Sequence, residues 1–349
     1  MTHPRLLASI ALVSCTWALA SCGSPPAKPS DPPAADACAA AARAERVGAV
    51  AALEFHSAFW PNLHHVLYVA AWARRGPGVR SRAGKLSTPL TGALTAGEQA
   101  AWDRAVAYYD RALAGMDLLF DDDMKAIGTA MVATCPPGIP AGLAPEHAAV
   151  LAAAAPVYRA HGWALHDRAN RAWIAGAIER VRALSPAVPE RLARLYGTPW
   201  FTAPVRVDVV IAGNRQGAYT SLGPTHITIS SSHPGGQGWA AAESIFHEAS
   251  HALVDPVEAA FDREAQAATR RLPDLWHAAL FYLTGEVVRQ ALAERGIPYV
   301  PYVYANGLFE RAWPQLRAPL EQHWRPYVDG QVALDEAVRQ VVAAVPGER

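Results

Sequence analysis

The segment 244–254 carries three residues whose types and spacing suit metal chemistry: His247, Glu248 and His251, in the pattern His-Glu-x-x-His. On a helix, residues four apart lie one above the other, so the two imidazoles point the same way and can bind one zinc ion. Glu248 lies about 100° further round the helix. From there its carboxylate can act as general base on a water molecule bound to the metal. Apolar residues flank the motif, which favours a buried helix.

Strand-forming segments precede this helix and are expected to position it. Residues 204–211 are rich in β-branched side chains and predict a strand, and the Gly and Asn residues that follow predict a turn. Residues 218–221 and 225–230 supply further strand material, and the second of these segments alternates in a way that buries one face. A loop rich in Ser and Gly, residues 231–238, then leads into the helix. The order is therefore strand, turn, strand, loop and metal-binding helix.

Residues 200–295 resemble the catalytic core of the zincin metallopeptidases, whose motif the His-Glu-x-x-His segment matches position by position. The resemblance implies a small antiparallel or mixed sheet, with an edge strand that lies beside the zinc helix and binds the substrate backbone by strand addition. It also implies Zn²⁺ as cofactor and a peptide or protein as substrate. Val254 and Val257 stand where the metzincin branch has Gly and His. The chain therefore resembles the gluzincins, in which a glutamate on a following helix completes the site.

Three residues are candidates for the third zinc ligand: Glu286, His277 and Glu264. Glu286 and His277 lie on the next strongly helical segment, residues 274–288, about half a rotation apart, so one unbroken helix cannot direct both at one ion. We predict Glu286, because a carboxylate with two His residues is a standard catalytic zinc set. The alternative is that Glu286 is a surface carboxylate near Arg289 and that His277 is the ligand. If His277 is not a ligand, its predicted role is catalytic, as a hydrogen-bond donor to the developing oxyanion.

Three tyrosines follow this segment: Tyr299, Tyr302 and Tyr304. Zincins often use a Tyr or His donor against the tetrahedral intermediate, so the resemblance makes each hydroxyl a candidate for that role. Packing of the rings against the core is the alternative for each of them. The tail, residues 316–345, predicts two further helices and carries no chemistry that we assign.

The start of the chain predicts export. Residues 1–21 comprise a short, positively charged N-terminal segment and an apolar run of signal-peptide length. Residues 19–22, Leu-Ala-Ser-Cys, resemble a bacterial lipobox, which implies cleavage before Cys22 and attachment to a membrane of the cell envelope through a lipid on its thiol. A plain secretory signal cut after Ala20 is the alternative, and it also exports the protein. Residues 22–36 are Pro-rich and predict an extended tether.

We predict two regions in the mature chain: a helical region, residues 37–199, and the zincin-like region, residues 200–349. Ala and Arg are abundant between 36 and 197, and we expect helices near 37–75, 95–133, 145–184 and 187–196. Thr95 with Glu98 predicts a capping box. Export to an oxidising compartment allows a disulfide between Cys38 and Cys135. The predicted fold class is therefore α+β and mostly helical.

Composition narrows the function classes. The chain has 349 residues, with 31 basic residues balancing 31 acidic ones, which argues against a nucleic-acid partner. The sequence contains no Gly-x-Ser-x-Gly motif, the pattern that would indicate a serine hydrolase. The predicted function is hydrolysis of peptide bonds by an exported, membrane-tethered zinc metallopeptidase. The alternative is a non-catalytic lipoprotein that keeps a zincin shape and acts as a binding or scaffold module.

Overall fold

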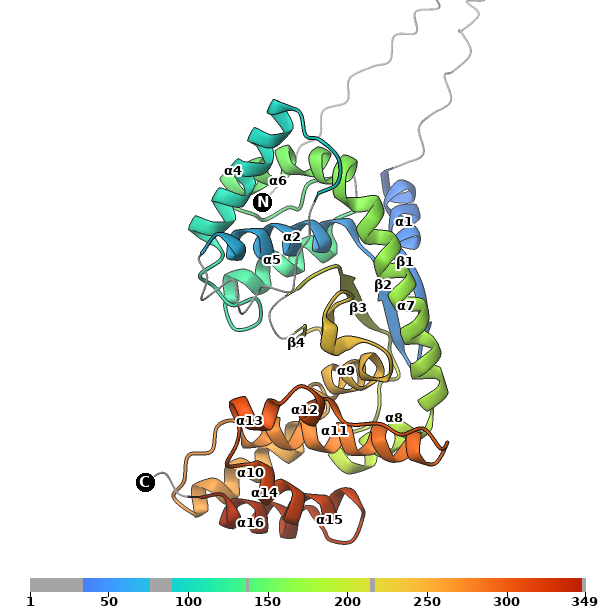
Figure 1. The fold of residues 1–349 in the computed structure, drawn as a ribbon, viewed down its shortest axis with the longest axis vertical. Coiled ribbons are helices and arrows are strands. Elements are labelled where there is room, and N and C mark those ends of the chain that lie inside the picture. The colour runs from blue at the N-terminus through green and yellow to red at the C-terminus, as the bar shows by residue number, and fades with distance from the viewer. Residues whose placement is uncertain (1–33, 76–89, 136–137, 214–216, 347–349) are drawn as a thin grey trace, which may run out of the picture.

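The structure, a computed structural model, describes residues 34–75, 90–135, 138–213 and 217–346. The predicted signal peptide, Cys22 and most of the predicted tether lie outside these residues. Within the described ranges, no helix combines the length and the hydrophobicity needed to span a bilayer. The fold is α+β and mostly helical, with one small mixed sheet, as the sequence predicts (Figure 1).

The sheet has five strands: β1 (Arg46–Val50), β2 (Leu53–His56), β3 (Val205–Val210), β4 (Ala218–Ser221) and β5 (His226–Ser230). Their order is β1-β2-β3-β5-β4. Strands β2 and β5 run parallel to β3 on either side, whereas β1 and β4 pair antiparallel with β2 and β5. The order leaves β4 as an edge strand, next to the helix that carries the His-Glu-x-x-His motif.

Helices surround the sheet. Those before β3 are α1 (Ala34–Glu45), α2 (Phe59–Arg74), α4 (Ala96–Ala112), α5 (Asp122–Ala133), α6 (Pro145–Tyr158), α7 (Ala164–Leu184) and α8 (Ala187–Tyr196). Those after β5 are α9 (Trp239–Ser250), α10 (Asp255–Ala267), α11 (Leu275–Ala293), α12 (Tyr302–Ala305), α13 (Leu308–Ala312), α14 (Arg317–Pro319), α15 (Arg325–Val328) and α16 (Leu334–Ala344). A 3₁₀ turn, Pro234–Gly236, precedes α9.

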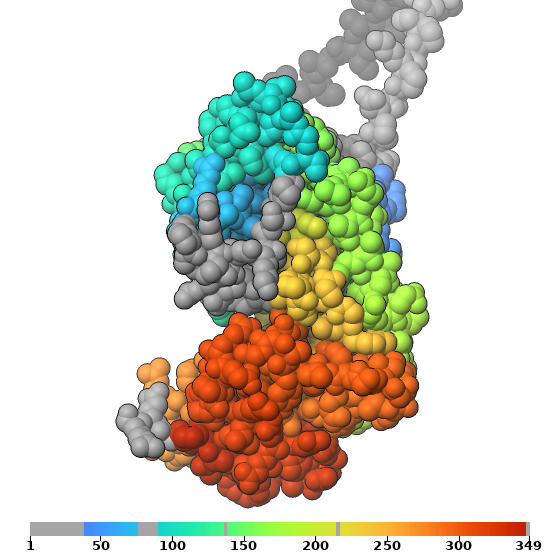
Figure 2. Space-filling view, in the orientation of Figure 1, coloured from blue at the N-terminus to red at the C-terminus, as the bar shows by residue number. Residues whose placement is uncertain are grey.

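Two hydrophobic cores hold these elements. Apolar side chains from one face of the sheet, such as Phe55 and Val207, pack with α7 to α11 and the C-terminal helices in the larger core. Helices α2, α4, α5 and α6 form the second core, above the sheet in Figure 1. In Figure 2 the C-terminal helices form the lower part of the molecule, and residues of the sheet and α9 lie between them and the N-terminal helices. The motif helix is therefore central.

The largest difference from the sequence prediction is at residues 46–56, which form β1 and β2 where we expected helix. Leu53 and Phe55 alternate with polar residues and are fully buried. Ala51 and Ala52 form the turn between the strands with φ of 51° and 63°, a conformation usually taken by Asn or Gly. Helical propensity is a weak preference. Pairing of β2 with β3 and burial of its apolar face therefore outweigh it here.

Other local predictions are confirmed. Strands β3, β4 and β5 fall at the predicted segments, and α8 spans the predicted residues 187–196. The capping box of Thr95 and Glu98 is present at the start of α4. Cys38 and Cys135 form a disulfide. The motif helix ends at Ser250, and Pro256 lies in the first turn of α10.

Buried histidines are unusually many in the N-terminal part of this fold. His64 and His147 both hydrogen-bond to the Tyr109 hydroxyl, at 3.0 and 3.1 Å. His65 Nε2 lies 2.9 Å from the Tyr219 hydroxyl, and His166 Nδ1 lies 3.0 Å from the Tyr158 hydroxyl. Burial lowers the pKa of His65, His147 and His166 to about 4. These side chains are therefore neutral in the folded protein at pH 7.

We expect the free energy of unfolding to fall steeply as the pH is lowered from 6.5 to 4. Over this range the unfolded chain binds protons at these histidines and the folded chain does not. Each histidine therefore lowers the free energy of unfolding by up to roughly 3 kcal/mol. Burial raises the pKa of Glu243 and Glu248 to about 7, which has the opposite sign and offsets part of the loss. Urea unfolding followed by tryptophan fluorescence at several pH values measures the effect. Equal stability at pH 7 and pH 4.5 would contradict this prediction.

Candidate metal centre

The motif lies on α9, which the core buries on nearly every side. Ile245, Phe246 and Ala249 are fully buried in the larger core. His247 and His251 therefore project from a fixed helix, one turn apart, with ring centroids 5.0 Å from each other. The local prediction from the sequence, a buried helix that carries two imidazoles one turn apart, is confirmed.

His277, in the first turns of α11, joins the two motif histidines. One ring nitrogen of each of the three residues lies within 4.8 Å of those of the other two. The ring centroid of His277 is 5.5 Å from that of His247 and 5.2 Å from that of His251. Three imidazoles from two helices therefore converge on one point.

Burial keeps these three imidazoles neutral. It lowers the pKa of His251 to about 3 and that of His277 to about 4. The pKa of His247 falls well below its ordinary value, first because of burial and then because of the other two rings. A neutral imidazole is the form that binds a metal. The three rings can therefore bind a cation at neutral pH without first losing protons.

Aromatic side chains hold the histidine rings in place. Phe281 stacks on His247 with centroids 3.6 Å apart, and Trp276 stacks on His277 at 5.1 Å. Trp313 lies edge-on to His277 at 5.6 Å. These contacts limit rotation of the rings and make the surroundings apolar, so less reorganisation is needed when a metal binds.

The residues present fit a catalytic zinc ion. Three neutral imidazoles are an established ligand set for zinc with an open fourth position. The Nδ1 atom of His247 is buried and has no hydrogen-bond partner among the described residues. An unpartnered buried polar atom is costly. The cost disappears if a metal ion binds this nitrogen.

Glu248 is fixed beside the histidines by the edge strand of the sheet. The Thr220 hydroxyl, on β4, lies 2.7 Å from Oε2 of Glu248 and 2.9 Å from its backbone carbonyl oxygen. Burial raises the pKa of Glu248 to about 7, and the bond from Thr220 acts in the opposite direction. A carboxyl group that titrates near neutral pH suits a general base. Sequence reasoning missed Thr220, because pairing between a strand and a later helix leaves no local signal.

Glu286, the predicted third ligand, does not belong to this group. Its carboxylate accepts hydrogen bonds of 2.8 to 3.0 Å from Arg289, one turn later on α11. The physical reason is helical phase, because the face of α11 that carries His277 lies against α9 and Glu286 is about half a rotation away. Glu264, on α10, also lies outside the group formed among the described residues. The structure thus brings His277 to the motif pair.

The three tyrosines differ in what their hydroxyls contact. The Tyr299 hydroxyl donates to Glu243 at 2.5 Å, and the Tyr304 hydroxyl donates to Glu321 at 3.0 Å. The Tyr302 hydroxyl has no hydrogen-bond partner among the described residues. Burial raises the pKa of its phenol, and the charge of Glu248 contributes to the rise. Of the three, Tyr302 is therefore the one whose hydroxyl is available near the general base.

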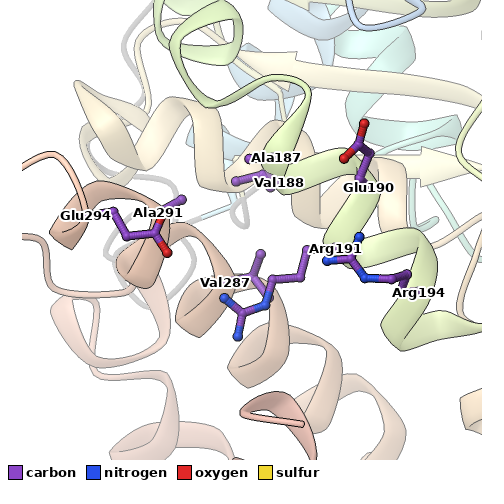
Figure 3. A pocket seen from close by; sticks show the side chains of 8 residues that line it. All are labelled: Ala187, Val188, Glu190, Arg191, Arg194, Val287, Ala291 and Glu294. Atoms are coloured by element: carbon purple, nitrogen blue, oxygen red, sulfur yellow. The ribbon is translucent and has the colours of Figure 1, made fainter.

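A separate cavity lies at the other end of α11. It measures about 310 Å³ and is lined by residues of α8, among them Arg191 and Arg194, by the end of α11 and by Glu294 just after it (Figure 3). None of the residues of the metal centre lines it. We assign it no part in the chemistry of the histidine group.

Comparison with known proteins adds no identification: the chain matches no protein family, no curated protein and no solved structure.

Proposed function

We propose that this protein is an exported zinc metallopeptidase. His247, His251 and His277 hold the zinc ion, and Glu248 is the general base. The observation that carries the proposal is the convergence of three neutral imidazoles beside a buried carboxylate that the edge strand holds in place. A structural zinc site has four protein ligands and needs no such carboxylate, so this arrangement favours an enzyme over the alternative of a binding or scaffold protein.

Zinc in this position supplies Lewis acidity, which polarises a substrate carbonyl and lowers the pKa of water towards 7. Glu248 accepts a proton from the attacking water and delivers it to the leaving amine. Thr220 keeps the Glu248 carboxylate oriented through both steps. Tyr302 donates a hydrogen bond to the oxyanion that develops on the carbonyl oxygen. Phe281 and Trp276 exclude bulk water from the reacting groups.

The substrate is proposed to bind along β4. Among the described residues β4 pairs with β5 on one side only, and its other edge is proposed to offer its backbone groups to an extended peptide. Thr220 lies on this strand, so a peptide added there passes Glu248. Strand addition recognises the backbone, and hence the proposed substrate class is an extended segment of a peptide or protein.

Chelation tests the proposal directly. The purified full chain is loaded with zinc, offered a mixture of unstructured peptides at pH 7.5, and the products are identified by mass spectrometry. We expect about one zinc per chain, cleavage products that vanish after chelation, and their return when zinc is restored. A zinc-loaded chain that leaves every peptide intact would overturn the proposed activity.

We further propose that the protein is tethered to a membrane through Cys22. The disulfide between Cys38 and Cys135 supports export, because such bonds persist in oxidising compartments. Cys22→Ser is expected to move the protein from the membrane fraction to the soluble fraction after cell fractionation. Retention of the variant in the membrane fraction would argue against the lipid anchor.

A further inference from the structure

Glu243 is a buried carboxylate on the metal-binding helix that the proposed chemistry does not use. It lies on α9 one turn before His247 and is 1% exposed. Both of its carboxylate oxygens accept a hydrogen bond from the Tyr302 backbone N–H, at 3.0 Å each. Its Oε2 also accepts from the Tyr299 hydroxyl. This one side chain therefore fastens both ends of the segment 299–302 to the zinc helix.

Helix α11, which carries His277, is shaped around this contact. A Cβ atom added to Gly285, on α11, would lie 2.7 Å from Cβ of Pro301 and 3.0 Å from Oε1 of Glu243. The first of these distances does not occur without displacement and the second is unusually short, so Gly allows α11, the segment 299–302 and the carboxylate to pack this closely. Burial of a carboxylate is costly unless it is well hydrogen-bonded. The Glu243 carboxylate therefore depends on its hydrogen bonds to Tyr299 and Tyr302, and the close packing at Gly285 fixes where it lies.

The residue that Glu243 fastens faces the metal centre. The Tyr302 ring stacks on Phe281 with centroids 6.1 Å apart, and Phe281 stacks on His247. On its other side, the Tyr302 hydroxyl lies against Gly235, where an added Cβ would be 3.1 Å from it. Backbone and ring together fix where the hydroxyl points.

We infer that Glu243 is a positioning residue of the proposed peptidase: it holds the backbone of Tyr302 so that the Tyr302 hydroxyl stays at the developing oxyanion. The inference rests on the proposed function. Glu243 acts through Tyr302 and touches neither metal nor substrate. Its loss should therefore lower kcat, leave KM and zinc content nearly unchanged, and have no further effect once the Tyr302 hydroxyl is gone.

A double-mutant cycle tests this at pH 8 with the zinc-loaded full chain. Glu243→Ala and Glu243→Gln are measured alone and combined with Tyr302→Phe. We expect Tyr302→Phe to lower kcat about 100-fold and Glu243→Ala to lower it roughly 30-fold, as a misplaced group does. Glu243→Gln, which keeps an acceptor for the Tyr302 N–H, should recover most of the loss. In the Tyr302→Phe background, we expect each Glu243 variant to change kcat less than about twofold.

Two further measurements separate positioning from general damage. Amide hydrogen exchange at Tyr302 should be at least about tenfold faster in Glu243→Ala, whether or not the chain is active. Gly235→Ala crowds Asn306 and the Tyr302 ring from the opposite side with Glu243 intact, and it should lower kcat in the same manner. The matched control is Glu321→Ala, which removes the acceptor of the Tyr304 hydroxyl outside the site and should change neither kcat nor exchange at the Tyr302 amide.

The outcomes are distinguishable. Equal losses from Glu243→Ala with and without the Tyr302 hydroxyl, or unchanged exchange at the Tyr302 amide, would overturn this inference while the proposed function stands. A zinc-loaded wild-type chain without peptidase activity would overturn the proposed function and the inference together. If Glu243→Ala does not fold, Glu243→Asp, whose shorter side chain withdraws the carboxylate from the Tyr302 N–H, takes its place in the cycle.

Discussion

Glu248→Gln is expected to lower kcat for peptide hydrolysis by about 10²- to 10⁴-fold, the range attributed to a general base, while the chain still binds one zinc ion. The amide has nearly the same shape as the carboxylate and keeps an oxygen for the Thr220 hydroxyl, but it cannot accept a proton from water. Zinc content by elemental analysis and kcat with one cleaved peptide measure the two effects. The fold should be unaffected, because the substitution preserves volume.

Thr220→Val is the companion to this variant. It leaves Glu248 in place and removes the bond to Oε2, which frees the carboxylate to rotate. We expect roughly tenfold lower kcat with zinc retained, between wild type and Glu248→Gln. Equal turnover by wild type and Glu248→Gln would reject the general base. Such a result would favour the alternative in which the protein binds partners and does not cleave them.

His277→Ala is expected to weaken zinc binding more than about 100-fold, beyond the usual effect of residues that only support a ligand. The variant leaves two imidazoles on one helix and no third protein ligand. Glu286→Gln should bind zinc as the wild type does, because the Glu286 carboxylate contacts Arg289 and not the histidine group. Competition with a chromophoric chelator measures both affinities.

The two variants form a matched pair, since both positions are on α11. Glu286→Gln weakens a partly buried ion pair and is expected to lower thermal stability slightly, with no change in zinc affinity. The opposite pattern, zinc retained by His277→Ala and lost by Glu286→Gln, would restore the ligand set suggested by the resemblance to gluzincins. It would contradict the arrangement described here.

The sequence predicts the parts of this fold that carry local signals. The His-Glu-x-x-His helix, the strand at 218–221 and the capping box at Thr95 follow from periodicity, composition and capping chemistry. Each of these signals acts within a few residues of the element that it predicts. They were sufficient to place Glu248 beside the two motif imidazoles.

Signals that depend on distant contacts were missed. Residues 46–56 read as helix because Ala is abundant, and their strand character comes from pairing with β3, far along the chain. The turn at Ala51 and Ala52 lacks the Asn or Gly that usually marks such a hairpin. Pairing between remote segments cannot be read from one sequence by periodicity alone.

The prediction of the third metal ligand had the same limit, because it also depended on contacts between segments that are distant in the sequence. From helical phase we predicted that His277 and Glu286 cannot both reach one ion, and the structure brings only His277 to the motif pair. The choice between the two residues depends on how α11 crosses α9, which the sequence does not show. Two local features pointed to His277: Trp276 and Phe281 flank it with aromatic rings, and Arg289 is spaced to pair with Glu286 on a helix. The prediction of Glu286 did not use the aromatic flanks; it rested on two His residues and a carboxylate as a standard catalytic zinc set.

X-ray absorption at the zinc edge of the loaded full chain tests the central claim most directly. We expect about one zinc per chain, with three imidazole nitrogens at about 2.0–2.1 Å and one further light-atom ligand. The imidazole scattering pattern should fall to two rings in any zinc that His277→Ala retains. A zinc ion with two imidazoles and a carboxylate in the wild type, or no stoichiometric zinc, would contradict it.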